Sequence, residues 1–216
     1  MKRISAFSVF IAALVVLSVS ALSRPVLAEE RENGDEGFSA YSVARLKVFE
    51  GTAWVRLPDS GEWEEFTTNS PVPERSRVNI PEGSEAELQF HGGQFVLLTG
   101  GTEIDVRRFD EQASAFRLRS GEIRFDLPPE DFSPARVAIP GDGKVSFPVP
   151  GRYWLSTQED GQTRLVVRSG EAAVTVERGD FRVKAGEAAM IGQEVRITAY
   201  TGREDDKYAA PTPLSE

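Results

Sequence analysis

The sequence predicts an all-β chain that folds as a single twisted β-sandwich or roll of stacked hairpins, with an N-terminal signal helix before it. Three observations predict this class. Apolar residues recur at every second position through 41–200, the alternating runs are short, and turn signals containing glycine or proline separate them. Successive strand side chains point to opposite faces, so each run presents one apolar face to a core. After residue 28 no stretch keeps a helical period for three turns.

The first element is an export signal predicted over residues 1–28. Lys2 and Arg3 form its basic start, 7–22 is apolar, and Val-Leu-Ala at 26–28 is a small-residue exit. We expect cleavage after residue 28, with only transient membrane contact. The alternative is an uncleaved anchor in the inner membrane, because 4–22 approaches the roughly 20 residues needed to span a bilayer.

Two polar flanks enclose the predicted β-domain, which covers 41–200. Residues 29–40 are expected to be a flexible acidic lead-in and 201–216 a disordered tail. The 216-residue chain carries a formal net charge of -9 and shows no cluster of basic residues in sequence, which argues against nucleic acid as a partner. It has no cysteine, so neither a disulfide framework nor a lipid-modified cysteine is expected.

Alternating apolar positions define the expected strands in order along the domain. They are Ala53/Val55/Leu57, Ala86/Leu88/Phe90, Phe95/Leu97, Ile104/Val106, Phe116/Leu118, Ile123/Phe125/Leu127, Val145/Phe147/Val149, Tyr153/Leu155, Leu165/Val167, Val174/Val176, Phe181/Val183 and Val195/Ile197. Each set is expected to face one core.

A short glycine motif recurs between these runs. A basic residue, a small residue, glycine and glutamate follow one another at 119–122, 168–171 and 184–187, and Glu-Gly-Thr at 50–52 is a weaker copy. Because glycine adopts a left-handed conformation at little cost, we expect structural turn glycines at hairpins or corners. These are Gly51, Gly93, Gly121, Gly170 and Gly186. The Arg-Gly-Asp tripeptide at 178–180 is interpreted in the same way, as a tight turn.

The order of these pieces resembles a known family. Residues 83–90 (GSEAELQF) are followed by 93–98 (GQFVLL) and 102–104 (TEI), and a later strand pair continues through 183–191 (VKAGEAAMI). This order is similar to the FecR-type periplasmic domain of Gram-negative iron-citrate transport regulators, over roughly 41–195.

The resemblance implies an exported, non-enzymatic FecR-like domain that mediates protein contact or sensing in the cell envelope, in the periplasm or secreted. It implies an envelope protein as partner, and it carries no catalytic residue. Family members that regulate transcription have a sigma-binding segment before a membrane helix, whereas here only residues 1–3 precede the apolar stretch. An alternative is a sensor component of an iron-responsive system in which a separate membrane protein supplies that role.

Catalytic, metal and cofactor sites are not predicted. His91 is the only histidine, and beside two glycines it is expected at a hairpin turn. Zinc would require carboxylates for nearly all its ligands, which it seldom accepts. Asp126, Glu130 and Asp131 form the densest candidate for calcium, but we interpret them as a solvated loop, because no calcium-loop motif is present.

The three tryptophans are compatible with one further class of function. Trp54, Trp63 and Trp154 are interpreted as core or edge anchors, since aromatic residues dominate burial. As an alternative they are ligand-face aromatics of a module that binds or cleaves carbohydrate or peptidoglycan, and the acidic residues around Trp63 suit that chemistry.

Overall fold

The computed structural model of the chain describes residues 43–109, 113–200 and 202. All of these belong to the larger of two compact units, residues 36–216. The predicted signal at 1–28, the lead-in at 29–40 and all of the tail except Gly202 lie outside the described residues.

The described strands form two nine-stranded sheets, named here sheet A and sheet B. In spatial order, sheet A contains β18 (Val195–Ala199), β17 (Glu187–Ile191), β14 (Thr163–Ser169), β13 (Gly151–Thr157), β10 (Glu122–Leu127), β7 (Phe95–Leu98), β6 (Glu85–Gln89), β1 (Val43–Glu50) and β4 (Pro71–Pro73). Sheet B contains β16 (Gly179–Lys184), β15 (Glu171–Val176), β12 (Lys144–Phe147), β11 (Ala135–Ala138), β9 (Ser114–Ser120), β8 (Thr102–Phe109), β5 (Arg77–Ile80), β2 (Ala53–Arg56) and β3 (Trp63–Phe66).

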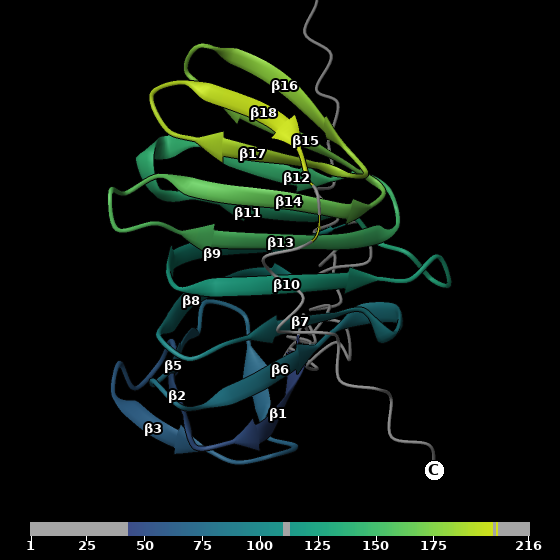
Figure 1. The fold of residues 1–216 in the computed structure, drawn as a ribbon. Helices are drawn as coiled ribbons and strands as arrows, with labels where there is room; N and C mark the ends of the chain where they lie inside the picture. The colour runs from purple at the N-terminus through teal and green to yellow at the C-terminus, as the bar shows by residue number, and fades with distance from the viewer. Residues whose placement is uncertain (1–42, 110–112, 201, 203–216) are drawn as a thin grey trace, which may run out of the picture. The chain divides into compact units, whose positions relative to one another are not determined.

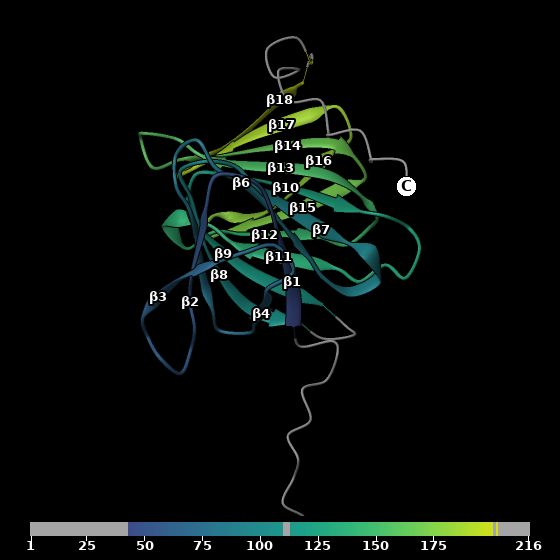
Figure 2. The ribbon, with the colours of Figure 1, turned by 90° about the horizontal axis from the view of Figure 1, so that it is seen from below.

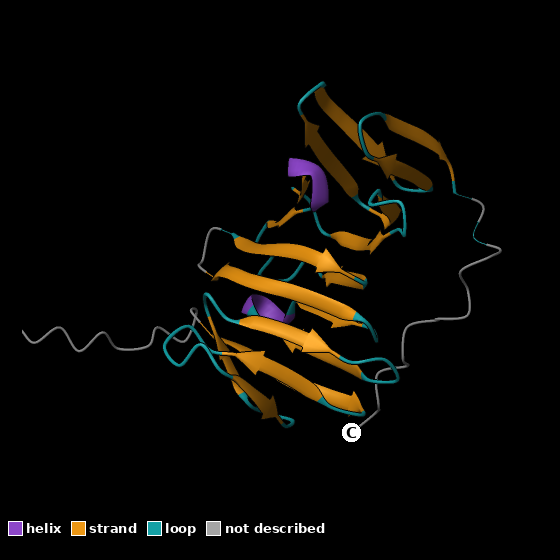
Figure 3. Cartoon of the chain, turned by 90° about the vertical axis from the view of Figure 1, so that its left-hand side faces the viewer, coloured by secondary structure: helices purple, strands orange, loops and turns teal. Residues whose placement is uncertain are grey.

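The two sheets form a β-sandwich, which confirms the predicted fold class. Sheet A faces the viewer in Figure 1, and Figure 2 shows both layers from below. Apart from strands, the described residues include the single-turn 3₁₀ segments η1 (His91–Gly93) and η2 (Pro140–Asp142), drawn in purple in Figure 3.

The chain builds both sheets together by passing repeatedly from one layer to the other. Hairpins β2–β3, β8–β9, β11–β12 and β15–β16 enter sheet B, whereas β6–β7, β13–β14 and β17–β18 enter sheet A. Strands β9 and β11 pair in parallel, and the other described pairings are antiparallel. Each of these hairpins after β2–β3 therefore pairs with a strand that precedes it in the chain.

The recurring glycine motif marks places where the chain passes from one sheet to the other. Gly51 joins β1 to β2, Gly121 joins β9 to β10, Gly170 joins β14 to β15, and Gly186 joins β16 to β17. Gly93 lies in η1, between the strands of one hairpin. All five have positive φ, between 67° and 88°, which glycine adopts without the penalty that a side chain brings.

A row of aromatic rings crosses the core between the sheets. Phe116, Phe125, Phe147 and Tyr153 come alternately from sheet B and sheet A, with successive ring centroids 5.4, 5.1 and 4.2 Å apart. The four residues are at most 2% exposed. Such interleaved rings bury large apolar areas and fix the distance between the two layers.

The structure corrects four of the expected core positions. In β7 the core side chains are Val96 and Leu98, not Phe95 and Leu97. Four apolar residues in a row carry no alternation, so the sequence does not show which pair faces inward. Val149 and Ile197 were also expected in the core but are each 38% exposed, because Val149 lies in the connection before β13 and Ile197 in the edge strand β18.

Candidate functional site

The outer face of sheet A carries the most distinctive group of side chains on the described surface. Ile123, Phe125, Tyr153 and Leu155 point into the core, so the alternate residues of β10 and β13 point outward. Cross-strand register aligns Arg124 of β10 with Trp154 of β13, and Trp154 with Val166 of β14, as one row on the outer face.

Trp154 lies between two arginines that come from the neighbouring strands. The guanidinium carbons of Arg124 and Arg168 are each 5.0 Å from the Trp154 ring, within the range for cation–π attraction. Tyr200 meets the indole edge-on with a centroid distance of 6.3 Å, and its hydroxyl accepts a hydrogen bond of 3.2 Å from Arg168. We call Arg124, Trp154, Arg168 and Tyr200 the Trp154 cluster.

Burial differs across the Trp154 cluster. Arg124 is only 8% exposed and forms an ion pair with Glu122, whereas Trp154 and Tyr200 are half-buried and Arg168 is exposed. The centre of this surface is thus already shielded from water while aromatic and cationic groups remain accessible. Arginine and large aromatic residues supply much of the energy at protein contact sites, so the arrangement suits a protein partner.

Beside the cluster, the same outer face carries two carboxyl groups whose ionised form is disfavoured by burial. Burial raises the pKa of Glu87, against the attraction of Lys47, and the charge of Asp126 raises it further. Burial likewise raises the pKa of Asp126, against the attraction of Arg152. Glu87 and Lys47 are cross-strand partners. Both acids are partly covered by sheet neighbours, which explains the direction of both shifts.

Sheet B carries an ion network on its outer face. Asp105 accepts hydrogen bonds of 2.9 to 3.0 Å from Arg77, Arg107 and Arg119, and its side chain is 9% exposed. Burial acts to raise the pKa of Asp105, but the hydrogen bonds and charges of the arginines outweigh it, so its pKa lies below the usual value. Because these groups satisfy one another across β5, β8 and β9, we assign the network a structural role.

The structure does not bring the three predicted tryptophans together. Trp54 of β2 and Trp63 of β3 lie on adjacent strands at one end of sheet B and are 37% and 40% exposed. Trp154 lies in sheet A. The chain therefore has a pair of exposed tryptophans near one end of sheet B and a separate Trp154 cluster on sheet A, rather than one aromatic platform.

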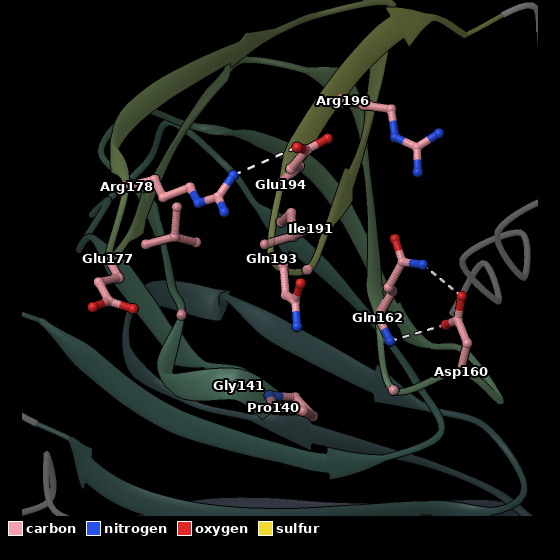
Figure 4. Close-up of a pocket in the computed structure, with 14 residues that line it drawn as sticks. Pro140, Gly141, Asp160, Gln162, Glu177, Arg178, Ile191, Gln193, Glu194 and Arg196 are labelled. Carbon is pink, nitrogen blue, oxygen red and sulfur yellow. Dashed lines mark hydrogen bonds and ion pairs between the residues drawn. The ribbon is translucent and has the colours of Figure 1, made fainter.

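A pocket of about 710 Å³ lies where four turns meet at one end of the sandwich (Figure 4). The turns are those of hairpins β11–β12, β13–β14, β15–β16 and β17–β18. Its charged groups largely engage one another: Arg178 and Glu194 form an exposed ion pair at 3.5 Å, and Asp160 accepts two hydrogen bonds from Gln162. With this open, mixed lining the pocket points to no particular ligand chemistry.

The other candidate residues from the sequence lie outside the Trp154 cluster. His91 begins η1, between β6 and β7, and its side chain lies outside what the structure describes. Arg178 lies in the turn after β15, and Gly179 and Asp180 begin β16. Within the described part of the chain, no three acidic or histidine side chains are grouped so that they could hold a metal ion, Asp126, Glu130 and Asp131 included.

Sequence reasoning named Trp154 but missed the residues around it. Arg124, Arg168 and Tyr200 are far apart in the chain, and only the pairing order β10–β13–β14 makes them neighbours. One available signal was their position within the alternation, because Arg124 falls between the core residues Ile123 and Phe125. That spacing predicts an outward side chain but not its partner.

Among the residues that the structure describes, no helix has the length and apolar character required to cross a membrane.

Comparison with known proteins gives a fold likeness. Two crystal structures of proposed anti-sigma factors from Parabacteroides distasonis superpose with TM-scores of 0.52 and 0.50, each at 18% sequence identity. The superpositions cover 61% and 57% of this chain, and 63% and 59% of the other chains, so this chain spans under two thirds of their length. No family model and no curated protein matches the sequence.

Proposed function

We propose that this chain is an exported, non-enzymatic FecR-like domain that takes part in signalling or sensing in the cell envelope through protein contact. The proposed contact surface is the outer face of sheet A around the Trp154 cluster. The predicted export signal at 1–28 supports the location. The fold shared with two proposed anti-sigma factors supports a signalling role.

The observation that carries the proposal is the position of Trp154 between Arg124 and Arg168 on the outer face of sheet A. A half-buried indole held by two cations is ordered before a partner arrives, so binding costs less side-chain entropy. Flanking arginines provide planar donors for carboxylates or carbonyls of the partner. A flat pleated face with such a centre is typical of protein contact.

The test is photocrosslinking in cells, with a benzophenone amino acid placed at Thr198. This exposed residue of β18 lies opposite Ala188, in the register row that leads through Val166 to Trp154. Position 198 is expected to crosslink to a discrete envelope protein, and Trp154→Ala is expected to abolish that product. The matched control is the same amino acid at Thr175, an exposed threonine on sheet B.

Two results would contradict the proposed surface. One is equal crosslinking from positions 198 and 175, and the other is a product at 198 that Trp154→Ala leaves unchanged in a variant whose melting temperature is retained.

The proposed location has its own test. Peptide mapping of material from the periplasmic fraction should give a chain that begins at Glu29, and an intact Met1 would contradict cleavage.

A second candidate function rests on the exposed pair Trp54 and Trp63. The two indoles lie on adjacent strands with Glu64 and Glu65 beside them, and exposed tryptophans stack on sugar rings. We infer carbohydrate or peptidoglycan binding at β2–β3 as the alternative. Titration with peptidoglycan fragments should then change tryptophan fluorescence in the parent and in Trp154→Phe, but not in Trp54→Phe/Trp63→Phe. A flat titration of the parent excludes it.

A further inference from the structure

The Trp154 cluster lies on a positively charged part of an acidic protein. From β10 to β18 the outward positions of sheet A carry five arginines and two acids, whereas the whole chain has a net charge of -9. The arginines are Arg124, Arg152, Arg164, Arg168 and Arg196, and the acids are Glu122 and Asp126. This charge is opposite to that of the chain as a whole, and it would attract an acidic segment.

The end of the described β-structure leads the chain onto this face. After β18 the backbone N–H of Tyr200 donates to the carbonyl of Gly186 at 2.7 Å, and its ring packs against Trp154. Arg168 and Arg164 both lie over the Tyr200 ring, at 5.5 and 6.0 Å. The chain that follows Tyr200 thus starts beside two arginines of the basic surface, Arg164 and Arg168.

The sequence that follows has the complementary charge. Glu204, Asp205 and Asp206 come four to six residues after Tyr200. Extended chain covers about 3.3 to 3.6 Å per residue, so these residues can reach roughly 13 to 22 Å from Tyr200. Strands β14 and β10 are two positions apart in sheet A, a separation of about 10 Å. Both Arg168 and Arg124 are within that reach.

We propose that the acidic segment Glu204–Asp206 binds in cis across the outer face of sheet A, with its carboxylates on the arginines around Trp154. Carboxylates and guanidinium groups form charge-assisted hydrogen bonds, often in pairs. A short tether gives the segment a local concentration on the order of millimolar, so a weak contact suffices for occupancy. The segment would then compete with any acidic partner for this face.

This inference goes beyond the proposed function and is tested without a partner. The measurement uses the full chain with Trp54→Phe and Trp63→Phe, which leaves Trp154 as the single tryptophan of the three. Two probes are followed: quenching of Trp154 fluorescence by iodide, and the indole N–H signal in an NMR spectrum. Iodide is an anion, so it reports whether the arginines around the indole are available to it.

The test variant is Glu204→Gln/Asp205→Asn/Asp206→Asn in that background. We expect iodide quenching to rise about twofold, since the carboxylates no longer occupy the arginines, and the indole signal to shift. The matched control is Glu30→Gln/Glu32→Gln/Asp35→Asn, which removes three charges from the acidic segment that precedes the β-domain in the sequence. The control is expected to leave both probes as in the parent. At 1 M salt, where screening extends over about 3 Å, the difference should shrink.

Three outcomes would overturn the proposal. Unchanged quenching and an unchanged indole signal in the tail variant would show that the segment is not bound. A change in the lead-in control instead would assign the face to residues 29–37. A change that disappears on dilution would indicate that the tail of a second copy, not the chain's own tail, occupies the face.

Discussion

The hydroxyl oxygen of Tyr153 occupies the space in which a side chain at Gly170 would have to begin. A Cβ built on Gly170 overlaps this oxygen and also lies 2.7 Å from the carbonyl oxygen of Pro150. The hydroxyl donates a hydrogen bond of 2.7 Å to the carbonyl of Val149. The corner between β14 and β15 is therefore closed over a buried tyrosine, which links a crossing between the sheets to the aromatic row of the core.

Gly170→Ala is expected to lower the free energy of unfolding more than Gly161→Ala. Both glycines have positive φ, 88° and 78°, so both substitutions strain the backbone by about 1 kcal/mol. A Cβ at Gly161 meets nothing within 4 Å, whereas at Gly170 it overlaps Tyr153. We expect a further loss of about 1–3 kcal/mol from the overlap, measured by urea unfolding. Equal losses at the two sites would show that the close contact costs nothing.

Tyr153 is expected to limit stability at high pH. Burial raises its pKa to about 12, against a value near 10 in an unfolded chain. A raised pKa means that the folded state favours the neutral phenol, so this stability is complete below about pH 10 and is lost as pH rises toward 12. In Tyr153→Phe, melting temperatures between pH 9 and 12 should fall less steeply than in the parent. Parallel curves would contradict the assignment.

Asp105 is expected to have the opposite pH dependence. Its pKa is lowered overall in the folded state, so its contribution is complete above the unfolded value of about 3.9 and is lost as pH falls through the folded pKa. Asp105→Asn should lower the free energy of unfolding at pH 7 by about 1–3 kcal/mol and flatten the acid limb of the stability curve.

The control for Asp105 is Glu171→Gln, which breaks an exposed ion pair with Arg182. The two groups are 2.8 Å apart, and the arginine side chain is 76% exposed. Exposed pairs contribute about 0–1 kcal/mol, so this variant should melt close to the parent. If both variants lose the same amount, the burial of Asp105 does not strengthen its ion network.

Glu87→Gln is expected to stabilise the protein at neutral pH. The pKa of Glu87 is raised, chiefly by burial, so its ionised form is less favourable in the folded state than in the unfolded state. The parent therefore loses stability as pH rises through this pKa, and removal of the charge should recover less than about 1 kcal/mol at pH 7. Below about pH 4 the two proteins should converge in urea unfolding. A less stable variant at pH 7 would show that the attraction of Lys47 dominates.

Period-two alternation predicted the fold class because most strands have one buried and one exposed face. It assigned inward residues correctly in strands such as β10, where charged side chains separate Ile123, Phe125 and Leu127. It failed in β7, where four apolar residues leave the register open. The alternating sets contain no residue of β1, β3, β4, β5, β11 or β17. Of these, β3, β4, β5 and β11 are only three or four residues long, which is too short for a clear alternation.

The candidate site was less predictable than the fold. Trp54 is exposed because it points away from the core, between the buried residues Ala53 and Val55 of β2. Trp63 lies in β3, the edge strand of sheet B, and local sequence does not reveal strand order. The Trp154 cluster requires the register of β10, β13 and β14 together with the return of the chain at Tyr200. Each of these pairings joins residues far apart in the chain, so composition and residue spacing do not predict it.

Each sheet is open at both ends, because among the described strands the terminal ones pair on one side only: β18 and β4 in sheet A, and β16 and β3 in sheet B. Backbone N–H and C=O groups along the outer side of such terminal strands are where a further strand can add.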